Sequence, residues 1–240
     1  MTEKNHTVRA YDEELIRLSA ELAEMGGMAE SMVADSLTAL SRMDTKLAQR
    51  VIATDARMDF LQRDIEERAI RVIVKRQPMA LDLREVVGCM RISADLERVG
   101  DLAKNISKRV VAISGGLGTN FGAKKVIIGL EHLSSIALEQ LKAVLDAYRE
   151  RSVTAAAIVR ERDDEIDALY TSLFRELLTY MMEDPRNITF CTHLLFCAKN
   201  LERVGDHATN IAETVHYVVT GQQLVDDRPK GDSTAVMPEG

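Results

Sequence analysis

The sequence predicts an all-α protein of two tandem antiparallel three-helix bundles. Three observations indicate this fold class. Only four prolines occur in 240 residues, so long stretches contain no obligatory helix breaker. Aromatic residues make up 4% of the chain and Trp is absent, whereas the aliphatic residues and Met, Glu and Arg that suit long helices are abundant. Finally, one segment occurs twice, which indicates an internal duplication.

The repeated segment reads "DLERVGDLAKNI" at 95–106 and "NLERVGDHATNI" at 200–211, and nine of the twelve positions are identical. A second, shorter similarity relates "DARMD" at 55–59 to "DDEID" at 163–167. The separations are 105 and 108 residues, and short insertions or deletions at turns explain the small drift. Each half therefore carries the same helical plan, which gives six helices in all and suggests a pseudo-twofold relation.

In the first half, apolar residues at three- and four-residue spacing predict a helix that continues to Met43. Asp44 is expected to be the N-cap of the second helix, which ends at the "RQP" turn before Met79. The third helix should extend from about Met79 to Ile113. The first bundle is therefore assigned to 8–113.

The densest glycine cluster of the chain, "SGGLGTNFG" at 114–122, is interpreted as the linker between the bundles. A nucleotide-binding loop is the alternative, but the GK[ST] ending and a preceding strand are missing. The second bundle is assigned to 123–221, and the tail at 222–240 is expected to be disordered. The expected helices of the second bundle are 123–150, 153–183 and 187–221.

Each copy of the repeated segment has an apolar face and a polar face, because residues three and four apart share one side of an α-helix. We expect the apolar face to pack inside the bundle and the polar face to stay accessible. The apolar faces comprise Leu96, Val99, Ala103, Ile106 and Val110, and Leu201, Val204, Ala208, Ile211 and Val215. The opposite faces comprise Glu97, Asp101 and Asn105, and Glu202, Asp206 and Asn210.

Pairs of acidic residues four positions apart occur four times, although like charges at this spacing destabilise an isolated helix by about 0.2–0.5 kcal/mol. Clustered carboxylates become favourable around a hard cation, and oxygen donors favour Mg, Mn, Ca or Fe. One hypothesis is therefore a metal cluster on each half. The other is a solvated acidic face, neutralised by Arg98, Arg203 and Lys104. The candidate ligands are Asp55, Asp59, Glu97, Asp101 and Asn105, and Asp163, Asp167, Glu202, Asp206 and Asn210.

Gly100 and Gly205 occupy equivalent positions inside the two predicted helices. Glycine costs about 1 kcal/mol relative to alanine inside a helix, so a close approach by packed groups or by a ligand is expected at both sites.

Composition limits the kinds of partner and the cellular compartment that we expect for this protein. The net charge of −7 disfavours nucleic acid and anionic lipid as main partners, because phosphate-rich surfaces attract basic patches. Cys89, Cys191 and Cys197 show no CxxC spacing, which indicates neither a disulfide framework nor a zinc site. The polar start and the lack of a long apolar run predict neither a signal peptide nor a membrane span. We expect a cytoplasmic protein.

An enzyme of the di-iron carboxylate type is a competing interpretation, because Glu213-x-x-His216 matches the Glu-x-x-His motif of such sites. The equivalent segment of the first half, "SKRV" at 107–110, lacks the motif. No Ser or Cys has the context of a catalytic triad either, so no catalytic residue is assigned. A metal-independent interaction module that uses acidic faces to bind basic partners is the other alternative.

Five segments resemble the PhoU family, the accessory regulators of the high-affinity phosphate transport system. Together they extend over nearly the whole chain. The segments are "GGM" (26–28), "KRQPMALDLREVV" (75–87), "ADLERVGDLAKNI" (94–106), "YMMEDPRNI" (180–188) and "CAKNLERVGDHATNI" (197–211).

The resemblance implies two three-helix bundles, E(D)xxxD motifs that can hold multinuclear metal clusters, and a homodimer. It also implies a non-enzymatic adaptor that represses the phosphate-starvation response. The implied partners are the ATP-binding subunit of the phosphate transporter and the phosphate-sensing histidine kinase, and the protein would reach the membrane only through them. The first and third motifs begin with Asp55 and Asp163 where the family pattern also admits Glu, and this shorter side chain would weaken metal ligation.

Overall fold

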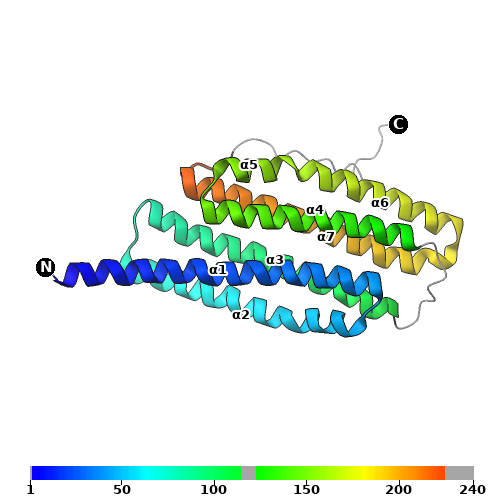
Figure 1. Ribbon diagram of the computed structural model, residues 1–240, viewed down its shortest axis with the longest axis horizontal. Coiled ribbons are helices and arrows are strands. Elements are labelled where there is room, and N and C mark those ends of the chain that lie inside the picture. Colours follow the sequence, from blue (N-terminus) through cyan, green and yellow to red (C-terminus); the bar gives the residue numbers. More distant parts are fainter. Residues whose placement is uncertain (1, 115–122, 225–240) are drawn as a thin grey trace.

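The computed structural model describes residues 2–114 and 123–224, with side chains from Glu13 to Ser114 and from Lys125 to Leu224. Within these ranges all regular structure is helical, and the long helices lie side by side in an elongated molecule (Figure 1). The all-α prediction is confirmed. The helices are α1 (Thr2–Arg42), α2 (Thr45–Arg76), α3 (Leu81–Ser114), α4 (Ala123–Glu150), α5 (Val153–Glu161), α6 (Asp163–Glu183) and α7 (Ile188–Thr220), with a short 3₁₀ turn, η1 (Pro185–Asn187), before α7.

Asp44 starts α2 as predicted. Its backbone is extended, and its Oδ1 accepts hydrogen bonds from the backbone N–H groups of Lys46 and Leu47, both at 3.0 Å. These two N–H groups belong to the first turn of α2 and have no partner within the helix, so the side chain satisfies them. At the other end, α2 stops at Gln77, whose φ of 47° lies in the left-handed region.

The expected helix 153–183 is interrupted, and the expectation of one continuous helix is wrong at Arg162. The buried Gln140 of α4 donates from its Nε2 to the Arg162 carbonyl at 2.8 Å. The same carbonyl accepts from the Glu165 N–H at 3.1 Å, which is a tighter turn than that of an α-helix. A tertiary hydrogen bond thus separates α5 from α6 without changing the six-helix plan.

The predicted apolar faces of both repeated segments form the core. Leu96, Ile106, Leu201 and Ile211 are fully buried, and all ten residues of the two apolar faces are at most 1% exposed. Burial of one such aliphatic side chain stabilises a fold by about 1.5–3 kcal/mol, so these faces account for much of the bundle packing.

The first three helices pack against one another, and α4 to α7 form the second group, above them in Figure 1. The two groups meet where α3 packs on α7 and where α1 packs on α4. Glycines allow both contacts, because an added Cβ at Gly26 would lie 2.8 Å from Leu145 Cδ1 and one at Gly88 would overlap Val218. The expected linker at 114–122 and the expected disordered tail at 222–240 fall almost entirely outside the described residues.

Candidate functional site

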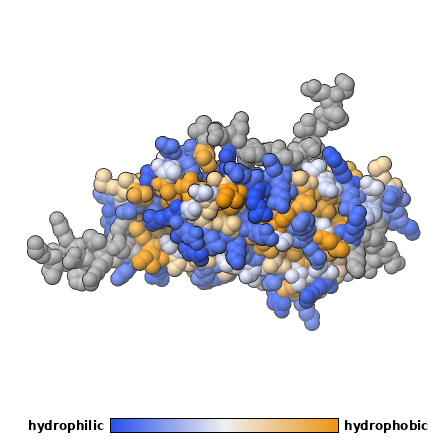
Figure 2. Space-filling view, turned by 45° about the horizontal axis from the view of Figure 1, so that its top comes forward, coloured by the Kyte–Doolittle hydropathy of each residue, from blue (hydrophilic) through white to orange (hydrophobic). Residues whose placement is uncertain are grey.

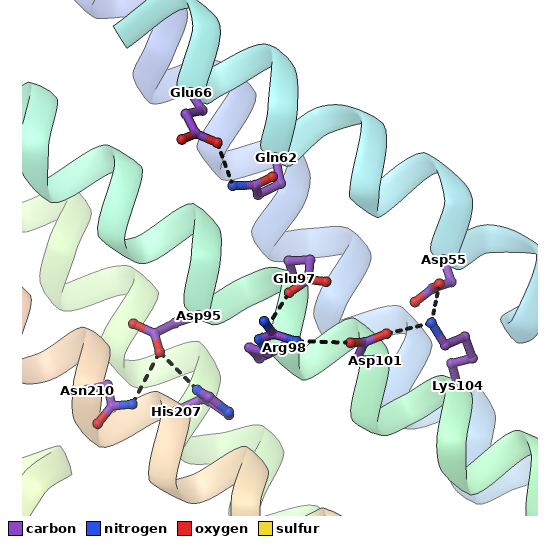
Figure 3. Close-up of polar contacts among 10 residues, drawn as sticks. All are labelled: Asp55, Gln62, Glu66, Asp95, Glu97, Arg98, Asp101, Lys104, His207 and Asn210. Atoms are coloured by element: carbon purple, nitrogen blue, oxygen red, sulfur yellow. Dashed lines mark hydrogen bonds and ion pairs between the residues drawn. The ribbon is translucent and has the colours of Figure 1, made fainter. Parts of the chain in front are cut away.

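The first acidic cluster lies between α2 and α3. Asp55 and Asp59 come from α2, and Glu97 and Asp101 come from α3. Lys104 of α3 extends between the helices, and its Nζ donates to Asp55 Oδ2 at 2.6 Å and to Asp101 Oδ1 at 2.5 Å (Figure 3). The predicted proximity of the acidic pairs on the second and third helices is therefore present, and one ammonium group links them.

Glu97 of this cluster is partly buried. Arg98 Nε lies 3.4 Å from Glu97 Oε2 and Arg98 Nη1 lies 3.5 Å from Asp101 Oδ2 (Figure 3), but the Arg98 side chain is 61% exposed, so these pairs contribute little stability. Burial and the negative charge of Asp101, with smaller effects of other nearby acids, raise the pKa of Glu97. Burial and the neighbouring carboxylates therefore disfavour the charged form of Glu97.

The second acidic cluster lies between α6 and α7 and is more deeply buried. Asp163, Asp167 and Glu202 are 4%, 7% and 6% exposed. Thr209 Oγ1 donates to Asp163 Oδ1 at 3.1 Å, and Lys199 Nζ donates to Glu202 Oε1 at 2.8 Å. The pKa of Glu202 is raised, mainly because the side chain is buried. The hydrogen bond from Lys199 lowers this pKa, and the charges of neighbouring carboxylates raise it.

The expectation that Glu202 lies on an accessible face is wrong. The simple picture of one packed face and one free face fails because α7 contacts α3, α4, α5 and α6. A helix surrounded in this way has little free surface, and even its polar positions become buried.

Each cluster contains a buried carboxylate oxygen for which the described residues supply no hydrogen-bond partner. These oxygens are Asp55 Oδ1 and Glu202 Oε2, and both side chains are more than nine-tenths buried. Such an atom costs free energy unless a cation or a donor reaches it, and carboxylate oxygens suit hard cations. In residues 2–114 and 123–224, no three His, Cys, Asp or Glu side chains are already grouped so that they could hold a metal ion. The carboxylate donors have the chemistry that a hard cation prefers, but in the described residues they are not arranged as a metal site.

The two asparagines of the predicted ligand set have different surroundings. Asn105 is exposed. Asn210 Nδ2 donates to Asp95 Oδ1 of α3 at 3.2 Å, and His207 Nδ1 lies 2.9 Å from the same oxygen (Figure 3). Asn210 therefore contributes to the contact between the bundles. Sequence reasoning did not assign Asp95 or His207, although both are positions at which the two repeated segments differ.

Gly100 and Gly205 have a packing role. Of the two expectations for these positions, a close approach by packed groups or by a ligand, the structure shows the first. An added Cβ at Gly100 would lie 3.1 Å from Met58 Cγ, and one at Gly205 would lie 2.6 Å from Ile166 Cδ1. Met58 and Ile166 belong to the helices that carry the partner carboxylates. The close approach that glycine permits thus brings α2 to α3 and α6 to α7 beside the acidic clusters.

Residues of the alternative chemistries are engaged elsewhere. Glu213 Oε1 lies 3.7 Å from Arg160 Nε, and His216 Nδ1 lies 3.0 Å from the backbone carbonyl of Gln222. The three cysteines are buried and free, and burial raises the pKa of Cys89 and of Cys197 to about 12. These thiols remain protonated at neutral pH and behave as small apolar side chains.

Comparison with known proteins decides the family. The profile of the PhoU domain matches residues 22–110 and again residues 130–215, so each half of the duplication is matched once. The chain belongs to the PhoU family. A PhoU homologue from Rhizobium meliloti, described as a phosphate-specific transport system accessory protein, is 60% identical over 97% of this chain and 96% of its own length. The homologue of the same description from Caulobacter vibrioides is 51% identical over 97% of this chain and 98% of its own length.

Solved PhoU structures share the fold. PhoU from Pseudomonas aeruginosa superposes with a TM-score of 0.83 at 35% identity, covering 88% of this chain and all of that one. The phosphate transport system regulatory protein PhoU from Streptococcus pneumoniae gives a TM-score of 0.81 at 28% identity, covering 89% of this chain and 99% of that one. The duplicated helical architecture is therefore that of PhoU proteins over nearly their full length.

Proposed function

We propose that this protein is a non-enzymatic regulator of phosphate uptake and phosphate homeostasis. It acts as an adaptor between the ATP-binding subunit of the phosphate ABC transporter and the phosphate-sensing histidine kinase, and it represses the phosphate-starvation response when phosphate is plentiful. The observation that carries this proposal is the match of both halves to the PhoU domain, together with full-length relatives described as accessory proteins of phosphate-specific transport.

An adaptor role also agrees with the surface. Apolar patches lie among charged side chains on the face shown in Figure 2. Met79 and Met182, beside the turns that follow α2 and α6, are 82% and 85% exposed, and Phe196 of α7 is 48% exposed. Exposed apolar side chains of this size suit contacts with other proteins, including a second copy of the chain in a homodimer.

The proposed location is the cytoplasm, at the inner face of the membrane and held there by the partners. None of the described helices is long and apolar enough to cross a membrane. The net charge of −7 disfavours anionic lipid and nucleic acid as main partners, which agrees with recruitment to the membrane through protein partners.

The acidic clusters are proposed to hold hard metal ions, with Mg, Mn or Fe as candidates. The ligands would be Asp55, Asp59, Glu97 and Asp101 in one cluster and Asp163, Asp167, Glu202 and Asp206 in the other. The unpaired oxygens of Asp55 and Glu202 support this assignment, because a cation would satisfy both. A bound ion would join α2 to α3 and α6 to α7 and so stiffen each bundle.

The regulatory role can be tested in cells that lack their own copy of the gene and carry a reporter of the phosphate-starvation response. Expression of the wild-type chain in phosphate-rich medium should silence the reporter. Purified protein should also bind the isolated ATP-binding subunit and the cytoplasmic part of the kinase. A reporter that stays active although the protein is folded and present at normal level would contradict the proposal.

A metal-independent adaptor is the second candidate, and it is supported by the ion pairs of Lys104 and Arg98 inside the first acidic cluster. Chelator treatment separates the two. Binding to partners through acidic faces alone should weaken steeply with salt but should not change when EDTA is added. Binding that requires loaded clusters should fall when EDTA removes the metal.

A further inference from the structure

A cavity of about 350 Å³ lies where the two bundles meet. Its walls come from α1 and α3 of the first bundle and from α4 and α7 of the second, beside the contacts of α1 with α4 and of α3 with α7 (Figure 1). Small-molecule sites in proteins have volumes of about 300–1,000 Å³ and favour such junctions. The residues that line this cavity are separate from both acidic clusters.

Gly27 of α1 lines the cavity, and packing does not explain why this residue is glycine. Glycine destabilises the interior of a helix relative to alanine. The preceding Gly26 has a packing reason, because an added Cβ would lie 2.8 Å from Leu145 Cδ1 of α4. An added Cβ at Gly27 would meet none of the described residues within 4 Å. Gly26 therefore lets α1 approach α4, whereas Gly27 leaves space beside that contact.

The cavity is elongated and has an apolar floor. Its lining residues on α1 extend from Ser19 to Glu30, which corresponds to about 16 Å along a helix. The most deeply buried lining residues are all aliphatic, with Leu22 and Val215 1% exposed and Val218 4% exposed. This floor favours a ligand with an apolar chain, because binding would remove both surfaces from water.

The charged groups of the lining leave one carboxylate without a basic partner. The lining contains three carboxylates and two guanidinium groups. Arg151 pairs with Glu85 of α3, and Arg149 Nη2 lies 2.9 Å from Asp146 Oδ1. Glu30 remains, and among the described residues its side chain makes no ion pair and no hydrogen bond. A cation therefore suits this end of the cavity better than an anion does.

The surroundings of Glu30 also favour a positively charged ligand. The pKa of Glu30 is raised, mainly by burial; the charge of Lys142 lowers this pKa and that of Asp146 raises it. An ammonium group beside Glu30 would favour the charged carboxylate, and a hydrogen bond between two charged groups is stronger than one between neutral groups.

We propose that this cavity binds a small organic cation with an apolar chain. The ammonium group would pair with Glu30, and the chain would pass Gly27 and lie against Leu22 and the valines of α7. Such a ligand would touch both bundles at once and so stabilise the contact between them. This inference depends neither on metal in the acidic clusters nor on the adaptor role.

Isothermal titration calorimetry of the untagged full-length protein tests the proposal, with octylammonium chloride as the probe. Octanol and sodium octanoate have the same chain length and serve as the neutral and the anionic comparison. Octylammonium should bind at about one per chain and at least about tenfold more tightly than octanoate. Octylammonium should also raise the melting temperature of the protein.

Two variants connect this binding to the cavity. Gly27→Leu should weaken octylammonium binding at least about tenfold by filling the space, and it should stay folded because leucine favours a helix. Glu30→Gln should bind octylammonium no better than octanol. Glu24→Gln is the matched control, because it removes an exposed acidic side chain of α1 outside the cavity and should leave binding unchanged.

The contrary outcomes are distinct. No binding of octylammonium to wild type, or unchanged binding to folded Gly27→Leu, would overturn the site. Octanoate binding as tight as that of octylammonium would overturn the assignment of a cation. Octylammonium affinity that falls as rising protein concentration produces a dimer would assign the cavity to a second copy of the chain and overturn the proposal. Failure of the reporter experiment would contradict the adaptor role alone.

Discussion

Replacement of Gly205 by alanine tests how closely α6 and α7 must approach to form the second cluster. The new Cβ would lie 2.6 Å from Ile166 Cδ1, whereas ordinary contact begins at 3.4 Å. Ile166 or the helices must therefore move by about 0.8 Å. Ile166 is 1% exposed, so it has no free space into which to move.

Two opposing terms set the size of the effect. Alanine is favoured over glycine inside a helix by about 1 kcal/mol, whereas overpacking of a tight core costs about 1–3 kcal/mol. Gly27→Ala is the matched control, because nothing lies within 4 Å of its added Cβ and only the favourable term remains. The free energy of unfolding of Gly205→Ala should be about 2 kcal/mol below that of Gly27→Ala.

Urea and thermal unfolding followed by circular dichroism measure this difference. For a chain of this size, about 2 kcal/mol corresponds to roughly 4–8 °C in melting temperature. Gly100→Ala should fall between the other two variants, because its Cβ would lie 3.1 Å from the flexible Met58. Equal stabilisation by Gly205→Ala and Gly27→Ala would refute the argument that glycine provides clearance between α6 and α7.

Three further predictions concern a cap, the thiols and the contact between the bundles. Backbone hydrogen bonds, that of Leu47 first, lower the pKa of Asp44, so its charge stabilises the fold above pH 3.8 and this contribution is lost as the pH falls through the folded-state pKa. Asp44→Ala should therefore melt below wild type at neutral pH, by a margin that narrows in acid. Asp44→Asn should restore only the part of the loss that does not depend on the charge. A margin independent of pH would argue against the charged cap. The three buried cysteines should stay unreactive toward a thiol reagent at mildly alkaline pH until urea unfolds the chain, and fast modification of the folded protein would contradict their burial. Asp95→Ala leaves the His207 ring without the carboxylate that it contacts, so the free energy of unfolding should fall by about 1–3 kcal/mol. The control is Asp164→Ala, which should have little effect because Asp164 is exposed. Equal effects of the two substitutions would show that Asp95 does not stabilise the contact between the bundles.

The helices could be predicted from the sequence because local signals agree with the packing. Three- and four-residue apolar spacing identified the core faces, and Asp44 identified the start of α2 through its hydrogen bonds to the first turn. The interruption at Arg162 could not be predicted, because its cause is the amide of Gln140 on another helix. A local pattern does not contain that contact.

The acidic clusters could be predicted only in part. The spacing located the four acidic pairs and their approach across helices. It did not show the burial of Glu202, because the position of α7 among four neighbouring helices depends on the whole fold. It also did not show that the Asn210 amide donates to Asp95 across the bundle interface. Two differences between the repeated segments, Asp95 against Asn200 and Leu102 against His207, were the available signal for this contact.

The measurement that tests the account most directly is the metal content of the untagged protein as purified from cells, determined by elemental mass spectrometry. Wild type is compared with Glu97→Ala/Asp101→Ala and with Glu202→Ala/Asp206→Ala. The account predicts metal in about stoichiometric amount in wild type, with about half of it lost in each double variant. A wild-type content below about one ion per ten chains, unchanged in both variants and after incubation with Mn, Mg or Fe, would contradict it, and the repeated segment would then be a docking surface.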